Sequence, residues 1–196
     1  HQWKVIAVNT PSHYILNLVL LGSSIAPKQT LAITIGAILP DVPIFIFYGV
    51  SKLIYKLPES EIWGKAYYEP FWQNLVALFH SFPIAIVGLI LCFYWKWQTG
   101  LVLFLSIIFH SLLDIPVHND DAHRHFFPLS NYRFISPISY WDPAHYGRIV
   151  ALIEVLLVVA VTPLAFGLVK SGISKGVIVA IDALYIVGYV RLYLNL

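Results

Sequence analysis

Apolar residues along this chain are grouped into six long segments, and the stretches between them hold most of the charged residues. The segments cover residues 12–23, 31–50, 71–94, 101–117, 149–169 and 176–194. A helix needs about 20 apolar residues to cross the hydrocarbon layer of a membrane, and most of these segments approach that length. The pattern predicts an all-α fold, a polytopic transmembrane helical bundle of about six spans.

Two of the predicted spans carry irregular features. The first is short and follows Pro11, so we expect either a half-helix or a longer span that includes Trp3 to Ala7 and is kinked at the proline. The second holds the sequence LPDVP, with Pro40, Asp41 and Pro43, near its middle. A break is tolerated inside a membrane where the freed backbone groups face protein or water. The second span is therefore predicted to be broken at LPDVP.

Composition supports a membrane protein made of one domain, residues 1–196. The chain is 59% hydrophobic and only 11% charged, whereas an ordinary soluble domain has roughly 25% charged residues. Charged residues mixed with Trp and Tyr over residues 51–70 predict an interfacial loop, and membrane lipid is the expected partner. The N-terminal HQWKVIAVNTPSH lacks a basic region and a cleavage site, so we do not expect a signal peptide.

Charge and cysteine content exclude several classes of function. The net charge is +2 without a cluster of Lys and Arg, which argues against nucleic-acid binding. The single cysteine, Cys92, excludes an intramolecular disulfide and a metal site built from thiolates. Lys and Arg are more frequent in the terminal segments, residues 51–70 and residues 118–148 than in the other loops, which predicts that both termini lie in the cytoplasm.

Five ionisable residues are predicted to lie at one depth, in the cytoplasmic half of the bilayer. At about 1.5 Å per helical residue, this level contains His13, Asp41, His80, His110 and Asp114. Ionisable groups in lipid cost free energy unless they are paired. A divalent metal ion would pair them, and zinc suits mixed His and carboxylate ligands, with manganese or iron as alternatives.

The strongest part of this pattern is His110 and Asp114, which stand four residues apart and so share one helix face. Each candidate ligand also has a simpler interpretation. His110 could hydrogen-bond a carbonyl with Asp114 as its partner, and His80 could pack between helices and bond Ser81. Asp41 could cap a half-helix, and His13 could be an interfacial histidine.

A second polar group follows the fourth segment. Within eight residues the chain places His118, Asp120, Asp121, His123 and His125. This density predicts a second metal ion or a set of acids and bases over the first, although a solvated loop is the simpler alternative. We expect His118, His123 or His125 to protonate a leaving group.

Four more ionisable residues complete the candidates. Glu154 comes within reach of the same depth, and Asp114 or Glu154 could orient a water molecule or a ligand histidine. Asp182 lies toward the other side of the membrane, and Asp142 and His145 are further loop candidates.

The sequences GAILPD, FHS, FHSLLD and FFPLS occur in this order between residues 10 and 132. Together they resemble the bacterial family of membrane-bound metal-dependent hydrolases, whose members carry an LPD motif, a His-Ser motif and an HxxxD helix followed by a Pro-Leu-Ser loop. The resemblance implies that the five residues at the common depth are metal ligands or their immediate supports. This chain has Pro43 where the family often has a second acid, and Leu75 and Val76 where it often has His-Arg.

The sequence therefore predicts a metal-dependent membrane hydrolase that acts on an ester or phosphoester at the cytoplasmic face, with a lipid or lipid-linked substrate. Two other classes stay open. A metal-ion or proton transporter would use the same groups, with Glu154 and Asp182 marking opposite halves of its path. A non-catalytic subunit or assembly factor of a larger complex would use the histidines to ligate haem. An oligomer is compatible with each of these functions.

Overall fold

The computed structural model describes residues 10–25 and 27–194, and all regular elements within these residues are helical. The α-helices are α1 (Thr10–Gly22), α2 (Thr30–Ile38), α3 (Val42–Gly49), α4 (Glu59–Gly64), α5 (Pro70–Phe79), α6 (Phe82–Tyr94), α7 (Gln98–Asp114), α8 (Gly147–Leu168) and α9 (Gly172–Tyr189). Short 3₁₀ turns are η1 (Leu39–Asp41), η3 (Ala66–Tyr68) and η4 (Pro143–His145), and π-helical turns are η2 (Val50–Ile54) and η5 (Val190–Leu194).

Within the described residues, four helical stretches are long and apolar enough to cross a membrane, which is consistent with an integral membrane protein. They are Thr30–Ile54, Pro70–Tyr94, Gly147–Leu168 and Gly172–Leu194. Helix α7 is apolar but shorter, with 17 residues, and α1 has 13. All six predicted segments are thus largely helical, but six full spans are not established. The alternative first span that included Trp3 to Ala7 lies outside the described residues.

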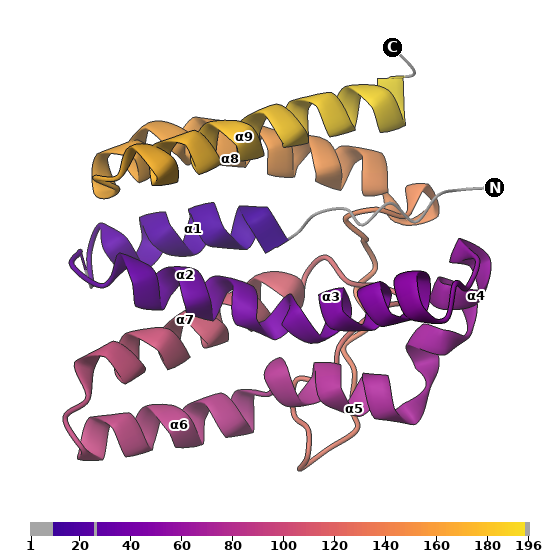
Figure 1. Ribbon diagram of the computed structural model, residues 1–196, viewed down its shortest axis with the longest axis horizontal. Helices are drawn as coiled ribbons and strands as arrows, with labels where there is room; N and C mark the ends of the chain where they lie inside the picture. Colours follow the sequence, from indigo (N-terminus) through magenta and orange to yellow (C-terminus); the bar gives the residue numbers. More distant parts are fainter. Residues whose placement is uncertain (1–9, 26, 195–196) are drawn as a thin grey trace.

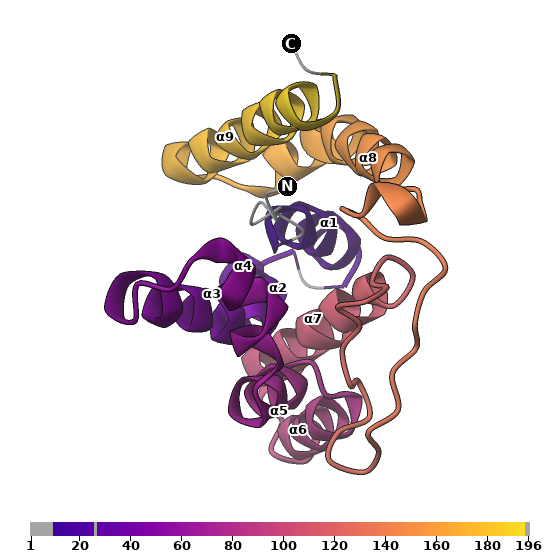
Figure 2. The same cartoon turned by 90° about the vertical axis from the view of Figure 1, so that its right-hand side faces the viewer.

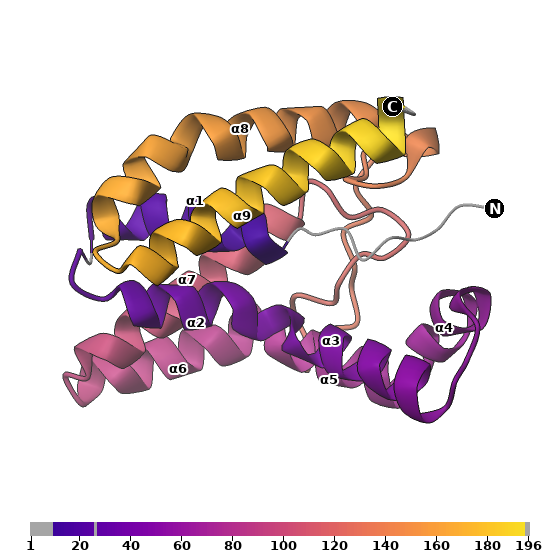
Figure 3. The ribbon, with the colours of Figure 1, turned by 45° about the horizontal axis from the view of Figure 1, so that its top comes forward.

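The helices are stacked, with α8 and α9 at one edge of the bundle and α5 and α6 at the opposite edge (Figure 1). Helices α8 and α9 pack on one side of α1, while α2 and α7 pack on the other. Figure 2 shows α1 enclosed between these groups, and Figure 3 shows α8 and α9 crossing over it. The α1–α2, α6–α7 and α8–α9 turns lie at one end of the bundle, and the long segment 115–146 lies toward the other end. Helix α1 is therefore the central element of the fold.

Helices α1, α2 and α7 pack closely together through Asn17, Ser106 and Gly36. Asn17 of α1 donates to the Ser106 carbonyl at 2.8 Å and to its hydroxyl at 3.0 Å, and the Ser106 hydroxyl donates to the Ile33 carbonyl at 2.7 Å. A Cβ atom at Gly36 would lie 2.5 Å from the Leu103 carbonyl oxygen. Glycine at position 36 is thus needed for the close approach of α2 to α7.

The second span is interrupted at LPDVP by one 3₁₀ turn, and the helix resumes at Val42. Pro40 and Pro43 cannot donate backbone hydrogen bonds, and their rings crowd the carbonyl groups of the preceding turn. The predicted break is therefore a local tightening within one continuous helical stretch. The third span contains a further interruption that the hydrophobic pattern did not predict, because α5 ends at Phe79 and α6 begins at Phe82.

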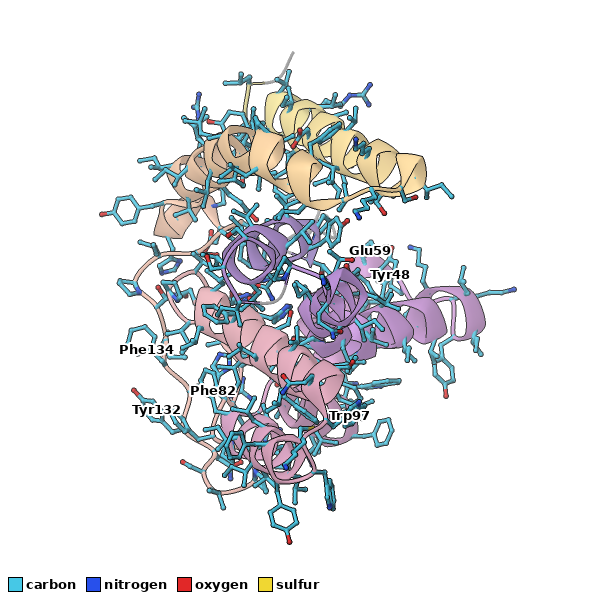
Figure 4. All side chains as sticks on the ribbon, turned by 90° about the vertical axis from the view of Figure 1, so that its left-hand side faces the viewer. Tyr48, Glu59, Phe82, Trp97, Tyr132 and Phe134 are labelled. Atoms are coloured by element: carbon cyan, nitrogen blue, oxygen red, sulfur yellow. The ribbon has the colours of Figure 1, made fainter. Side chains whose placement is uncertain are left out.

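The segment around residues 51–70, predicted as an interfacial loop, contains the short helix α4. Aromatic rings of α3, α4, η3 and α5 pack here, with Phe47 in the middle of Trp63, Tyr67 and Trp72. In Figure 4, Tyr48 and Glu59 point toward each other, and the Tyr48 hydroxyl donates to Glu59 at 3.1 Å. The segment thus combines packed aromatic rings with charged side chains, as its sequence indicated, but part of it is helical.

Candidate metal centre

Four helix ends or interruptions meet at one place in the bundle. Helix α1 begins there at Thr10, the second span tightens at Asp41, α5 gives way to α6 at His80, and α7 ends at Asp114. An interruption in a helix releases backbone groups and turns side chains in directions that a regular helix does not offer. The predicted ligands are thus presented from four separate segments, and all five are buried.

One ring nitrogen of His110 is fixed by a hydrogen bond, and the other faces the carboxylates of Asp41 and Asp114. Its Nδ1 lies 2.8 Å from the Ala37 carbonyl, which can only accept, so Nδ1 carries the proton and donates. Its Nε2 lies 3.2 Å from Asp114 Oδ2 and 3.6 Å from Asp41 Oδ1. Fixing the tautomer in this way is the usual role of a carbonyl behind a metal-binding histidine.

His80 has the same arrangement. Its Nδ1 donates to the Val76 carbonyl at 2.9 Å, and its Nε2 lies 3.5 Å from both Asp41 Oδ1 and Asp114 Oδ2. Within the part of the chain that the structure describes, the Nε2 atoms of His80 and His110 form no hydrogen bond. Buried polar atoms are normally satisfied. Two Nε2 atoms that converge on shared carboxylates fit a cation held between them.

His13 and Thr10 extend the cluster onto α1. His13 Nε2 lies 2.9 Å from Asp114 Oδ1, and its ring lies 3.9 Å from the ring of His110. The Thr10 hydroxyl donates to Asp41 Oδ2. Asp41 therefore has one oxygen fixed by Thr10 and the other directed to His80 and His110.

Among residues 10–25 and 27–194, three sets of side chains have donor atoms close enough together to bind a metal ion. They are His13, His110 and Asp114; Asp41, His80 and His110; and His80, Asp114 and His123. Within each set the donor atoms lie within 4.8 Å of one another. Tetrahedral zinc with bonds of about 2.0–2.1 Å places its ligand atoms about 3.3 Å apart, close to the 3.5 and 3.6 Å from Asp41 Oδ1 to the two imidazoles. The residues present fit a divalent metal ion.

The segment after α7 folds back onto this cluster. The Phe82 backbone N–H donates to the His125 carbonyl at 2.8 Å, and the Ser81 hydroxyl donates to the Phe127 carbonyl. The Ser136 N–H donates to the His118 carbonyl at 3.0 Å. The first two contacts attach the segment to the α5–α6 interruption, the third joins two parts of the segment itself, and His118, His123 and His125 are buried. The simpler alternative of a solvated loop does not describe these three histidines.

The three loop histidines lie in different electrostatic environments. Burial opposes protonation of His118, but Asp121 at 3.1 Å and Asp114 at 3.4 Å raise its pKa well above the ordinary value. Burial, with the neighbouring imidazole of His80, lowers the pKa of His123 well below its ordinary value. Burial also lowers the pKa of His125 to about 4. His118 is thus the loop histidine that best holds a proton.

His123 lies closer to the predicted ligands than its position in the sequence suggested. Its ring lies 4.1 Å from the ring of His80 and 4.8 Å from that of His118. It belongs to one of the three ligand sets, whereas the sequence placed it with the proton donors. A histidine in an irregular segment has no periodicity that would reveal this location.

Glu154 lies on α8, against the start of α1. It accepts from the Ser12 hydroxyl at 2.6 Å and from the Tyr185 hydroxyl at 3.0 Å. The Ser12 backbone N–H donates to the Tyr185 hydroxyl at 3.1 Å. Glu154 therefore fixes the end of α1 next to His13, and it is not part of the three ligand sets.

The remaining acidic candidates are not among the three ligand sets of the described residues. Asp182 of α9 accepts from the Thr162 hydroxyl of α8 at 3.0 Å. Asp142 lies 2.7 Å from His145 Nδ1 near η4, and the His145 side chain is 42% exposed. Asp120 lies in the segment that folds over the centre, next to Asp121. Within the described residues, Asp182, Asp142 and His145 belong to none of the candidate ligand sets.

The comparisons with known proteins do not add a relative. The chain matches no protein-family model, no curated protein and no solved structure. The case for a metal centre therefore rests on the geometry of these residues.

Proposed function

We propose that this protein is a metal-dependent hydrolase of the bacterial cytoplasmic membrane, with both termini in the cytoplasm. The observation that carries the proposal is the pair of buried imidazoles, His80 and His110, whose Nδ1 atoms donate to carbonyl groups while their Nε2 atoms face Asp41 and Asp114. The similarity of the LPD, His-Ser and HxxxD motifs to membrane-bound metal-dependent hydrolases supports the same function.

The residues divide into holding and proton-transfer roles. Asp41, His80 and His110 would hold the ion, and zinc suits this mixture of ligands. A bound divalent ion supplies Lewis-acid chemistry and makes a nucleophile available from water at neutral pH. Asp114, which lies between His13 and His110, would orient that water and accept its proton.

His118 would act as the proton donor to the leaving group. Asp121 and Asp114 favour its protonated form, and its Nε2 lies 3.4 Å from Asp114 Oδ1. His118 would therefore give its proton to an alkoxide or phosphate oxygen, and the proton that Asp114 receives from water would then restore the imidazolium form of His118. His123 and His125, with lowered pKa values, are neutral and suit ligation or substrate contact.

The setting favours a lipid or lipid-linked ester or phosphoester as substrate. The centre lies among helices whose other faces are apolar and exposed, for example Phe93 of α6 at 75% and Leu156 of α8 at 60% exposure. Such surfaces are solvated by lipid in a membrane protein. A substrate in the same bilayer can thus approach without crossing into water.

The first experiment measures metal content in the purified full chain. Wild type is expected to retain one or two zinc ions per chain, and His110→Ala and Asp41→Ala, which each remove a proposed ligand, are expected to lose most of this metal. His145→Ala is the matched control, since it removes a histidine that is paired with Asp142 outside the ligand sets. Equal metal content in all four proteins would overturn the metal centre.

The second experiment tests the reaction. A panel of lipid phosphoesters and esters is incubated with wild type and with His118→Gln, and product release is followed. Loss of a general acid reduces turnover by about 10²–10⁴-fold, so we expect His118→Gln to keep its zinc and lose activity to this extent. Turnover equal to wild type would assign proton donation to another group.

The transporter alternative has less support from the contacts. Glu154 and Asp182, the acids that a transport path would use, are each hydrogen-bonded to hydroxyl groups of adjacent helices. Flux of zinc or protons into proteoliposomes separates transport from hydrolysis, and an absorption spectrum of the purified protein tests haem ligation by a complex subunit.

A further inference from the structure

An apolar groove lies between α1, α2 and α9, and no residue of segment 115–146 lines it. Its volume is about 860 Å³, and its walls include Tyr14, Leu31, Ile38, Ile173, Val177 and Ile181. At one end it is bordered by Lys28 of the α1–α2 turn and Lys170 of the α8–α9 turn, and at the other by Thr10. The groove is thus mainly apolar, with the hydroxyl groups of Thr34 and Ser174 among its walls, and it is basic at one end only.

The length of the groove matches one leaflet of a bilayer. It follows α2, whose 9 residues span about 14 Å at 1.5 Å per residue. Half of the hydrocarbon layer is about 15 Å thick. The turns that carry the two lysines lie at the end of the bundle (Figure 1), where Trp97 of the α6–α7 turn is also found (Figure 4). The groove therefore runs from the headgroup level toward the middle of the membrane.

The basic end has charge available for an anionic group. Both lysines are exposed, and within residues 10–25 and 27–194 neither has a carboxylate at ion-pair distance. Helices α2 and α9 also begin at this end, so their positive dipole ends add to the two lysine charges. Two lysines at the membrane surface favour an anionic headgroup over a zwitterionic one by roughly thirtyfold.

A second apolar groove begins at the same turn. It has a volume of about 640 Å³, lies against α6 and α7, and shares Pro27 and Lys28 with the first groove. Phe93 and Leu105 line its apolar wall. Two grooves that diverge from one lysine match the shape of a lipid whose two chains leave one headgroup.

We propose that these grooves bind an anionic phospholipid with two acyl chains. Its phosphate lies at Lys28 and Lys170, one chain follows α2 toward Thr10, and the other lies against α6 and α7. Since the Thr10 hydroxyl donates to Asp41, the end of the first chain reaches the wall of the metal centre. This site is separate from the proposed hydrolysis and does not depend on it.

The test measures lipid retention by native mass spectrometry of the full chain, released from micelles that contain phosphatidylglycerol or phosphatidylcholine. Wild type is expected to retain one phosphatidylglycerol, with roughly thirtyfold preference over phosphatidylcholine. The double variant Lys28→Gln/Lys170→Gln should bind both lipids equally. Lys96→Gln, a change at the α6–α7 turn outside both grooves, should behave as wild type.

A second pair of variants tests the acyl chain. Val177→Trp fills the first groove and should weaken retention of both lipids by about tenfold, whereas Val179→Trp, on the same helix but outside the groove, should not. The proposal is overturned if wild type does not distinguish the two lipids, if Lys96→Gln is as damaging as the double variant, or if the two tryptophan variants behave alike. Zinc content, measured in parallel, should stay at the wild-type value in every variant, which separates this test from that of the metal centre.

Discussion

Gly36→Ala should disturb the metal centre without changing a ligand. The added Cβ would lie 2.5 Å from the Leu103 carbonyl oxygen and 2.6 Å from Ser106 Cβ. Ordinary contacts begin at about 3.5 Å, so α2 must move from α7 by about 1 Å. The hydrogen bond from His110 to the Ala37 carbonyl, now 2.8 Å, would lengthen to roughly 3.8 Å and be lost.

Two quantities should change in this variant. Overpacking costs about 1–3 kcal/mol of unfolding free energy, and loss of the carbonyl behind a ligand histidine lowers metal affinity by about 10–100-fold. Zinc affinity is measured by competition with a chromogenic chelator, and stability by heat-induced unfolding in detergent. Gly49→Ala is the control, because it lies in the same helical stretch and its Cβ would meet nothing within 4 Å. Zinc affinity equal to that of Gly49→Ala would refute the proposed coupling between helix spacing and ligand geometry.

Three further predictions follow from individual contacts. Removing zinc with a chelator should lower the free energy of unfolding by about 2.7 kcal/mol, compared with protein in a free zinc concentration 100 times the Kd. An unchanged unfolding midpoint would contradict a bound metal. Ser81→Ala removes the N-cap of α6 and the hydrogen bond to the Phe127 carbonyl. It should cost about 0.5–2 kcal/mol of unfolding free energy and weaken zinc binding. Ser171→Ala removes the N-cap of α9 and should leave zinc binding unchanged in the same titration. Asp182→Ala breaks its hydrogen bond to Thr162 and should cost no more than about 2 kcal/mol; loss of zinc from this variant would place Asp182 in the centre after all.

The convergence of the five predicted ligands could be derived from sequence because depth in a membrane is a one-dimensional quantity. Counting residues along each apolar segment placed His13, Asp41, His80, His110 and Asp114 at one level, and the structure brings their side chains together. Their ligation of a metal stays a prediction. The apolar segments were likewise visible, since hydrophobic composition alone defines them.

Depth does not specify which face of a helix a residue occupies. Glu154 was placed at a suitable level, but it faces Ser12 and Tyr185. The fold of the segment that carries His123 depends on backbone contacts such as that between Phe82 and His125, which leave no periodic signal. The interruption after His80 did have a signal, because Pro83 lies in the first turn of α6, where proline favours a helix start.

The separation of the ligands along the chain has a consequence for biogenesis. His13 and Asp114 are 101 residues apart, and the segment that covers them follows later still. While the ribosome is still extending the chain, the early histidine has no carboxylate partner from α7, and the ion-binding set is incomplete. Delivery of the proposed metal ion would therefore come late in membrane insertion, after α7 has docked against α1, and a chain truncated before that point is expected to leave the translocon without it.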